Sequence, residues 1–125
     1  EGVNTAVEVM QAEANLEKLR FQLAQAKDRI RLEVRQKYLA VTEAAQVLAL
    51  TKLSRDQAEE NYGMQKVKFE LGVATNLELL TAQNTLNAAQ NDYLNAEYDY
   101  YLAVSALYHA LGETDEFMLE VRDDA

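Results

Sequence analysis

The chain contains no proline and only four glycines among its 125 residues. Proline and glycine are the residues that most often end or bend a helix, so there are few positions where a helix could stop. About half of the residues are hydrophobic, which is enough to pack helices against one another. The sequence therefore predicts an all-α protein built from very few, long helices.

Charge and cysteine content exclude several kinds of protein. The net charge of −9 argues against binding to nucleic acid or anionic membranes, because phosphates are bound by clustered lysine and arginine. The chain has no cysteine, which excludes a disulfide framework and a thiolate site. No run approaches the roughly 18 consecutive apolar residues of a membrane helix, and no signal-peptide pattern follows Glu1. We therefore expect a mature piece or a fragment of a longer protein.

The segment FELGVATNLELL, residues 69–80, predicts a sharp turn between two helices. Gly72 can adopt the left-handed conformation that closes a helix C-terminus. Thr75 is followed three residues later by Glu78, which is the spacing of a capping box at a helix start. One helix should end and another begin within about four residues, forming the tip of an αα-hairpin.

The same kind of signal sets the expected helix bounds. Thr5 and Glu8 repeat the capping-box spacing, so a first helix should run from about residue 5 to 71. A second helix should run from about 76 to 111, where Gly112 ends it. Gly63 should weaken the first helix by about 1 kcal/mol relative to alanine without breaking it.

The second helix carries an unbroken heptad pattern. Large residues recur every seven positions and alanines recur between them: Leu79, Leu86, Tyr93, Tyr100 and Leu107, with Ala82, Ala89, Ala96, Ala103 and Ala110. Such a pattern predicts a left-handed coiled coil. Alanine at every second seam position lets the partner helix approach to the short end of the usual interaxial distance of about 8–10 Å.

The first helix has an apolar stripe that should form the other side of this seam. Its predicted members are Leu16, Leu19, Leu23, Ala26, Ile30, Val34, Tyr38, Val41, Ala45 and Leu48, continuing less regularly through Ala58, Tyr62 and Phe69. At 1.5 Å per residue the first helix would be roughly 100 Å long and the second about 54 Å. Folding back at Gly72 would therefore leave residues 5–35 without a partner.

An apolar stripe without a partner must be covered by something else, because such a helix gains most of its stability from packing. One possibility is a break near residues 27–29, which would fold the chain into a three-helix bundle. No glycine, proline or loop cluster lies there, so an unbroken helix is the favoured interpretation.

The chain resembles the C-terminal half of TolC-like outer-membrane efflux proteins, clearly from Glu33 to Gly112 and more loosely over residues 5–32. The residues that carry the resemblance are Phe69, the run Gly72-x-x-Thr75-x-x-Glu78-Leu79-Leu80, Ala82-Gln83, Tyr93 and Ala110-Leu111-Gly112. In that family a long helix descends through the periplasm, turns at a glycine tip and returns as a shorter helix.

The resemblance implies a larger assembly. Residues 1–112 would form a periplasmic helical hairpin with its tip at 72–75, and residues 113–125 an acidic C-terminal tail. Three protomers would together build an α-barrel that serves as a passive tunnel, reaching the outer membrane through parts outside this chain. The partners implied are a periplasmic adapter protein and, through it, an inner-membrane transporter. Because the family has two such tips per protomer, the opening EGVNTAVEVM could also be an echo of the other tip.

Site residues follow from the same resemblance. At the tip, the implied adapter-docking positions are Leu71, Gly72, Val73 and Thr75. Taken without the resemblance, these residues simply form a well-made turn and cap.

Just after the tip, the resemblance places Glu78 and Thr81 at the lumen-facing entrance of the tunnel, although Glu78 is also the capping-box glutamate. Better-known members carry a basic residue two positions after the tip glycine and a tyrosine three before it, as links that close the entrance. This chain has Ala74 and Phe69 there, so closure by those polar links is in doubt.

No residues predict catalysis, a metal site or a cofactor. His109 is the only histidine and lacks acidic neighbours at ligand spacing. Asp56, Glu59 and Glu60 are interpreted as a solvated face with pairs to Lys52 and Arg55. The tyrosine-rich stretch is interpreted as core packing, since Tyr93 and Tyr100 occupy the seam.

Other functions remain as alternatives to the channel segment. The chain could be the coiled-coil hairpin of a periplasmic adapter, although only FMLEV at 117–121 resembles a strand of such a protein. It could also be a stand-alone helical module for scaffolding or dimerisation, which would require a break in the first helix. A ligand-binding four-helix enzyme is the weakest alternative, because the metal ligands it would need are missing.

Overall fold

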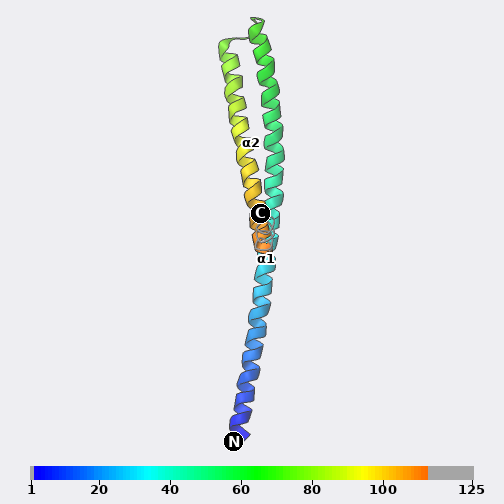
Figure 1. Ribbon diagram of the computed structural model, residues 1–125, viewed down its shortest axis with the longest axis vertical. Helices are drawn as coiled ribbons and strands as arrows, with labels where there is room; N and C mark the ends of the chain where they lie inside the picture. The colour runs from blue at the N-terminus through cyan, green and yellow to red at the C-terminus, as the bar shows by residue number, and fades with distance from the viewer. Residues whose placement is uncertain (1, 113–125) are drawn as a thin grey trace, which may run out of the picture. The chain divides into compact units, whose positions relative to one another are not determined.

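The computed structural model describes residues 2–112 and contains two helices. Helix α1 spans Gly2–Glu70 and helix α2 spans Asn76–Leu111, with five residues between them (Figure 1). The described residues contain no strand. This confirms the prediction of an all-α helical hairpin. The predicted acidic tail at 113–125, including FMLEV, lies outside the described residues.

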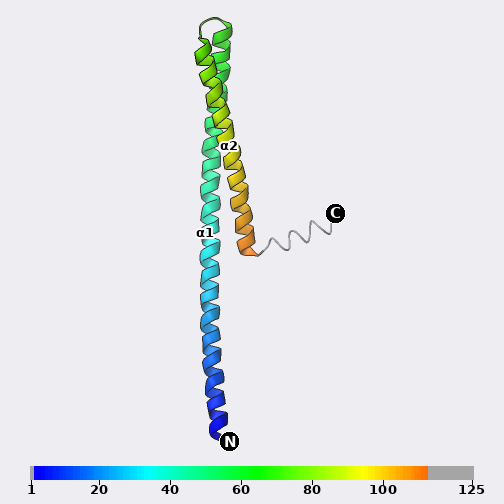
Figure 2. The same cartoon turned by 90° about the vertical axis from the view of Figure 1, so that its left-hand side faces the viewer.

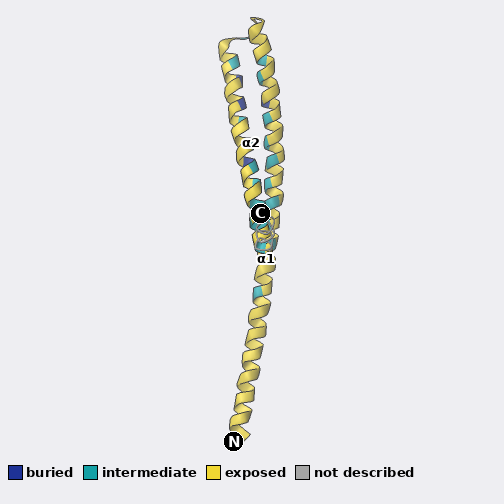
Figure 3. Cartoon of the chain, viewed as in Figure 1, coloured by how far each residue is buried: buried dark blue, intermediate teal, exposed yellow. Residues whose placement is uncertain are grey.

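The chain divides into two units, residues 1–36 and residues 37–125. In the second unit, α2 runs back antiparallel along α1, as the two perpendicular views show (Figures 1 and 2). The sides on which the two helices face each other carry the buried and half-buried residues (Figure 3). This seam is the hydrophobic core of the second unit.

The α2 side of the seam is the one predicted. All ten heptad positions are buried or half-buried, and Ala82 and Ala96 are each only 4% exposed. The pattern is reliable because each turn of a coiled coil brings the same heptad positions to the partner.

The α1 side differs from the prediction. Its covered residues in the second unit follow two heptad series: Val41, Leu48, Arg55 and Tyr62 in one, and Lys37, Ala44, Thr51, Ala58 and Gln65 in the other. Tyr38, Ala45 and Phe69 were predicted members, but all three are exposed. Val41, Leu48, Ala58 and Tyr62 were predicted correctly. The other three positions were wrong because the prediction followed apolar residues alone, whereas the seam also includes polar residues.

One contact fixes how the two sides of the seam are aligned. The Arg55 guanidinium carbon lies 4.3 Å from the centre of the Tyr93 ring. Heptad steps from this contact place Leu48 opposite Tyr100 and Ala58 opposite Ala89. Layers in which large side chains meet therefore alternate with layers in which an α2 alanine faces an alanine or a polar residue of α1.

The first unit is a single helical stretch whose apolar stripe is mostly exposed, with only Ala26 and Val34 half-buried. Leu16, Leu19, Leu23 and Ile30 are between 48% and 61% exposed. Helix α1 is continuous through residues 27–29, so the three-helix alternative is wrong. The predicted helix start at Thr5 is also wrong, because Gly2 to Asn4 are already helical and leave no extended backbone for a cap.

Candidate functional site

The tip of the hairpin begins with a closed backbone turn at the end of α1. Gly72 has a φ of 74°, and its N–H donates to the Phe69 carbonyl at 3.0 Å. The N–H groups of Val73 and Ala74 both donate to the Lys68 carbonyl, at 2.9 and 3.2 Å. This is the Schellman arrangement, which satisfies carbonyls that a helix end would otherwise leave unpaired.

The start of α2 is held by the predicted capping box. The Glu78 N–H donates to the Thr75 hydroxyl at 3.2 Å, and the Thr75 N–H donates to the Glu78 carboxylate at 2.7 Å. The Thr75 hydroxyl also donates to the same carboxylate oxygen at 3.1 Å. The hydrogen bond from the Thr75 backbone is the main cause that lowers the pKa of Glu78, and the bond from the Thr75 hydroxyl is the second. The charge of nearby Lys68 lowers this pKa further.

Three aliphatic side chains project from this hydrogen-bonded turn. Leu71, Val73 and Leu77 are each 72% exposed. Of the predicted docking residues, Leu71 and Val73 therefore face solvent, whereas Gly72 and Thr75 build the turn. Leu77 was not predicted, although it lies between the two capping residues, where a side chain is directed away from the cap. We call Leu71, Val73 and Leu77 the tip triad.

A groove lies beside the tip between the two helices and has a volume of about 350 Å³. Its lining residues are Asn61 and Gln65 from α1 and Leu77, Glu78, Thr81, Ala82 and Thr85 from α2. The structure thus brings Glu78 and Thr81, the two predicted entrance residues, to one surface. Asn61 and Gln65 were missed, because polar residues on a long helix carry no local signal of what lies opposite.

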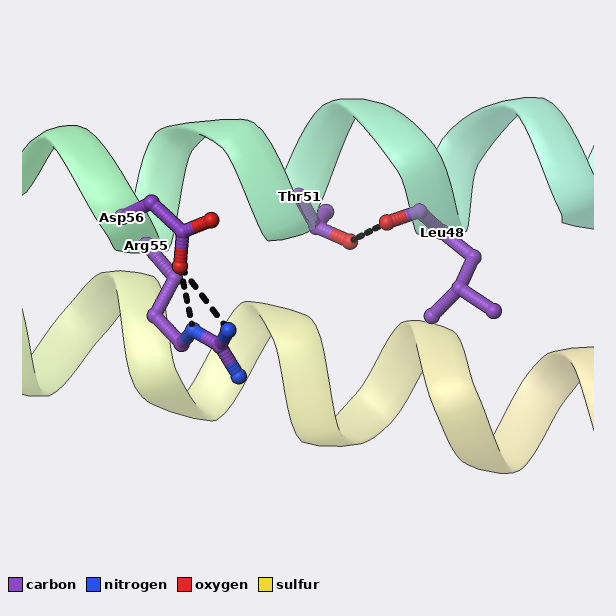
Figure 4. Close-up of polar contacts among 4 residues, drawn as sticks. All are labelled: Leu48, Thr51, Arg55 and Asp56. Carbon is purple, nitrogen blue, oxygen red and sulfur yellow. Dashed lines mark hydrogen bonds and ion pairs between the residues drawn. The ribbon is translucent and has the colours of Figure 1, made fainter.

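A polar cluster interrupts the seam about midway along the hairpin. Arg55 donates from Nε and Nη2 to one Asp56 oxygen, at 3.1 and 2.8 Å (Figure 4). This bond to Asp56 is the main cause that raises the pKa of Arg55, and the charge of Glu59 contributes too. The predicted solvated acidic face is therefore partly engaged with the seam. On the turn before, the Thr51 hydroxyl donates to the Leu48 carbonyl at 3.0 Å, so it is satisfied within α1.

Residues 2–112 lack two further features that would point to other functions. They contain no group of three or more histidine, aspartate and glutamate side chains placed to hold a metal ion. Within the same range, neither helix is sufficiently long and apolar to cross a membrane.

Comparison with known proteins gives the family. The family model described as "Outer membrane efflux protein" matches residues 2–113. The chain belongs to the outer membrane efflux protein family. This is a family of transport channels rather than of enzymes, and it is the family to which the tip and heptad residues had pointed.

One curated relative of this efflux-family chain is the alkaline protease secretion protein AprF of Pseudomonas aeruginosa. The two are 28% identical over 120 residues, which cover 96% of this chain and 25% of AprF. The chain thus spans about a quarter of the length of that relative. No solved structure matches the chain.

Proposed function

We propose that this chain is a segment of the wall and entrance of an outer-membrane efflux or type I secretion channel. The hairpin would lie in the periplasm of a Gram-negative bacterium and work passively, with energy supplied by an inner-membrane transporter. Family membership supports a transport role, and the secretion function named for AprF supports the secretion alternative. The family match favours the channel over an adapter hairpin or a stand-alone scaffold.

The observation that carries the proposal is a second heptad stripe on each helix, away from the seam. On α2 the stripe consists of Leu80, Leu94, Tyr101 and Tyr108, which are 50% to 63% exposed. On α1 it consists of Leu39, Leu50, Leu53, Met64 and Val67, which are 50% to 65% exposed. We call these the outer stripes.

Outer stripes have a direct structural meaning. Large exposed apolar patches are rare on proteins that work as monomers, and a heptad spacing fits a helix as the occupant. A hairpin in which each helix can pack against two neighbours can be extended sideways into a continuous wall. Three protomers of the full-length protein would close such a wall into a tunnel, with Glu78 and Thr81 at its entrance.

Cysteine cross-linking in the full-length protein tests the wall. This segment has no cysteine of its own, and any cysteine elsewhere in the full-length protein is first replaced by serine. Leu53→Cys and Leu94→Cys, on the outer stripes, should each form cross-links to neighbouring helices through a short linker that has a thiol-reactive group at one end and a photoreactive group at the other. The matched controls Lys52→Cys and Asp99→Cys lie off the stripes and should stay unlinked. Equal cross-linking of stripe and control positions would contradict the wall.

The tip is the proposed docking site for a periplasmic adapter protein. Leu71, Gly72, Val73 and Thr75 form the surface, and Leu77 extends it. The tip triad supports this role, because exposed aliphatic side chains on a backbone with satisfied hydrogen bonds can bind a partner without first becoming ordered.

Docking is tested by measuring the affinity of the purified adapter from the same transport system for the full-length channel. Leu71→Ser and Val73→Ser should each weaken binding by about tenfold, the typical cost of losing one buried aliphatic contact. Leu102→Ser, at an exposed position of α2 off the outer stripes, is the control and should leave adapter affinity unchanged. If both tip variants bind with the original affinity, the tip does not dock the adapter.

A further inference from the structure

Arg55 occupies a position where an apolar residue would be expected. It lies in the α1 seam series of Val41, Leu48 and Tyr62, so each heptad neighbour is a hydrophobic residue. Its side chain is 27% exposed, against 52% for Asp56. A half-buried guanidinium in a coiled-coil seam costs desolvation, and such residues are retained in some coiled coils because they select the partner.

The α2 helix provides a specific environment for this cation. The ring of Tyr93 lies under the guanidinium at 4.3 Å, within the range of an attractive cation–π contact. Asp56 receives two of its N–H groups on the edge of the seam, and the charge of Glu59 acts in the same direction. Asp56 and Glu59 belong to α1 and accompany Arg55 with any partner, so the Tyr93 ring is the contact that only α2 provides.

The same seam offers a competing partner, which is the α1 helix of a second copy. In a parallel pair of α1 helices, equal positions face one another across the seam. Val41, Leu48 and Tyr62 would then each face the same residue of the second copy and form large apolar layers. Arg55, however, would face Arg55 of the second copy, with no ring between the two charges.

We propose that Arg55 is a partner-selecting residue that directs the α1 seam to α2 and rejects pairing of α1 with a second α1. Like charges in one layer disfavour the wrong pair, while the Tyr93 ring lowers the cost in the right one. Lys37 adds a like-charge layer of the same kind at the open end of the seam. The proposal concerns the hairpin itself and holds whether or not the chain forms part of a tunnel.

A selecting role and a stabilising role predict different results for Arg55→Leu. Replacing a buried ion by a hydrophobic residue of similar volume is often neutral or stabilising. If Arg55 selects the partner, the leucine variant should keep its unfolding midpoint or raise it, yet lose specificity. If Arg55 only stabilises the hairpin, the variant should unfold more easily and stay unpaired with other copies.

The experiment uses thiol exchange on the 125-residue chain, which is otherwise free of cysteine. The double variant Ala58→Cys, Ala89→Cys should form a disulfide within one chain when the hairpin is present, since the alignment of the seam places these positions opposite each other. Ala58→Cys alone reports α1–α1 pairing as a disulfide dimer in a glutathione buffer. Adding Arg55→Leu should raise the dimer fraction by about tenfold, the scale of discrimination expected from a lost cation–π contact and a relieved charge clash.

Two controls make the outcome decisive. Lys52→Leu removes the same charge from an exposed position of α1 and should leave the dimer fraction unchanged. Tyr93→Leu keeps the cation but removes the ring, so it should lower the unfolding midpoint of the hairpin. An unchanged dimer fraction in Arg55→Leu, or a dimer fraction that rises equally in Lys52→Leu, would overturn the proposal.

Discussion

The glycines in and near the tip act through backbone conformation rather than through the space around them. Gly72 and Gly63 illustrate this, because an added Cβ would meet no atom within 4 Å at either position. They differ only in dihedral angles: Gly72 has a φ of 74°, whereas Gly63 lies inside α1. The same substitution should therefore have opposite effects at the two sites.

We expect Gly72→Ala to destabilise the hairpin by about 1–2 kcal/mol, the cost of a left-handed conformation for a residue with a Cβ. Gly63→Ala should stabilise it by about 1 kcal/mol, because alanine is the better helix former. Urea unfolding followed by circular dichroism measures both. Changes of the same sign at the two positions would show that backbone conformation is not the deciding factor.

The capping glutamate makes tip stability depend on pH. In the folded chain the pKa of Glu78 lies below its ordinary value of 4.5, so the ionised form is the one that stabilises the tip. That contribution is fully present above pH 4.5 and is lost as pH falls through the lowered pKa. Glu78→Gln should therefore be less stable than the original chain at neutral pH. The difference in stability between the two proteins should shrink as the pH is lowered.

The measurement is the difference in unfolding midpoint between the two proteins along a descending pH series. Glu60→Gln, which removes a charge from an exposed position of α1, is the matched control. A gap that stays constant or widens at acidic pH would contradict the role assigned to the Glu78 carboxylate.

At the scale of the helices, a feature can be predicted from sequence when the residues that determine it lie close together along the chain. The tip was predicted correctly because Gly72, Thr75 and Glu78 act within a few residues of one another. The α2 seam was predicted because its heptads are unbroken. The α1 seam was predicted only in part, because Arg55 and Gln65 are polar residues that are covered only because of what lies opposite them. The groove beside the tip was missed for the same reason.

The alanine layers set how closely the two helices approach. Ala96 is 4% exposed and lies opposite Thr51 in the alignment of the seam, so there is no room for a larger residue. We expect Ala96→Leu to destabilise the hairpin by about 1–3 kcal/mol through overpacking. Ala88→Leu, the same change at an exposed position of α2, should alter the unfolding free energy by less than about 0.5 kcal/mol.

Thermal unfolding of these two variants provides the comparison. If Ala96→Leu unfolds at the same temperature as the original chain, the seam can open to accept a leucine. The small layers would then not determine the separation of the helices.

At the scale of the whole molecule, the two units differ in what covers them. The hairpin unit has a seam of its own, whereas the apolar stripe from Leu16 to Ile30 in the first unit is exposed. Helices gain most of their stability from packing such a stripe, and local stability follows the contacts that each segment makes. The two units should therefore open independently and at very different rates.

Hydrogen exchange on the dilute 125-residue chain tests this difference. Amides of residues 5–35 should exchange much faster than those of the α2 seam, residues 79–107. In the full-length channel, where further helices are available, residues 5–35 should become protected as well. Protection that is already equal in the dilute chain would mean that the stripe needs no partner. It would also remove one reason for placing this segment in a wall of helices, because a helix that is stable alone does not need to pack its apolar side against other helices.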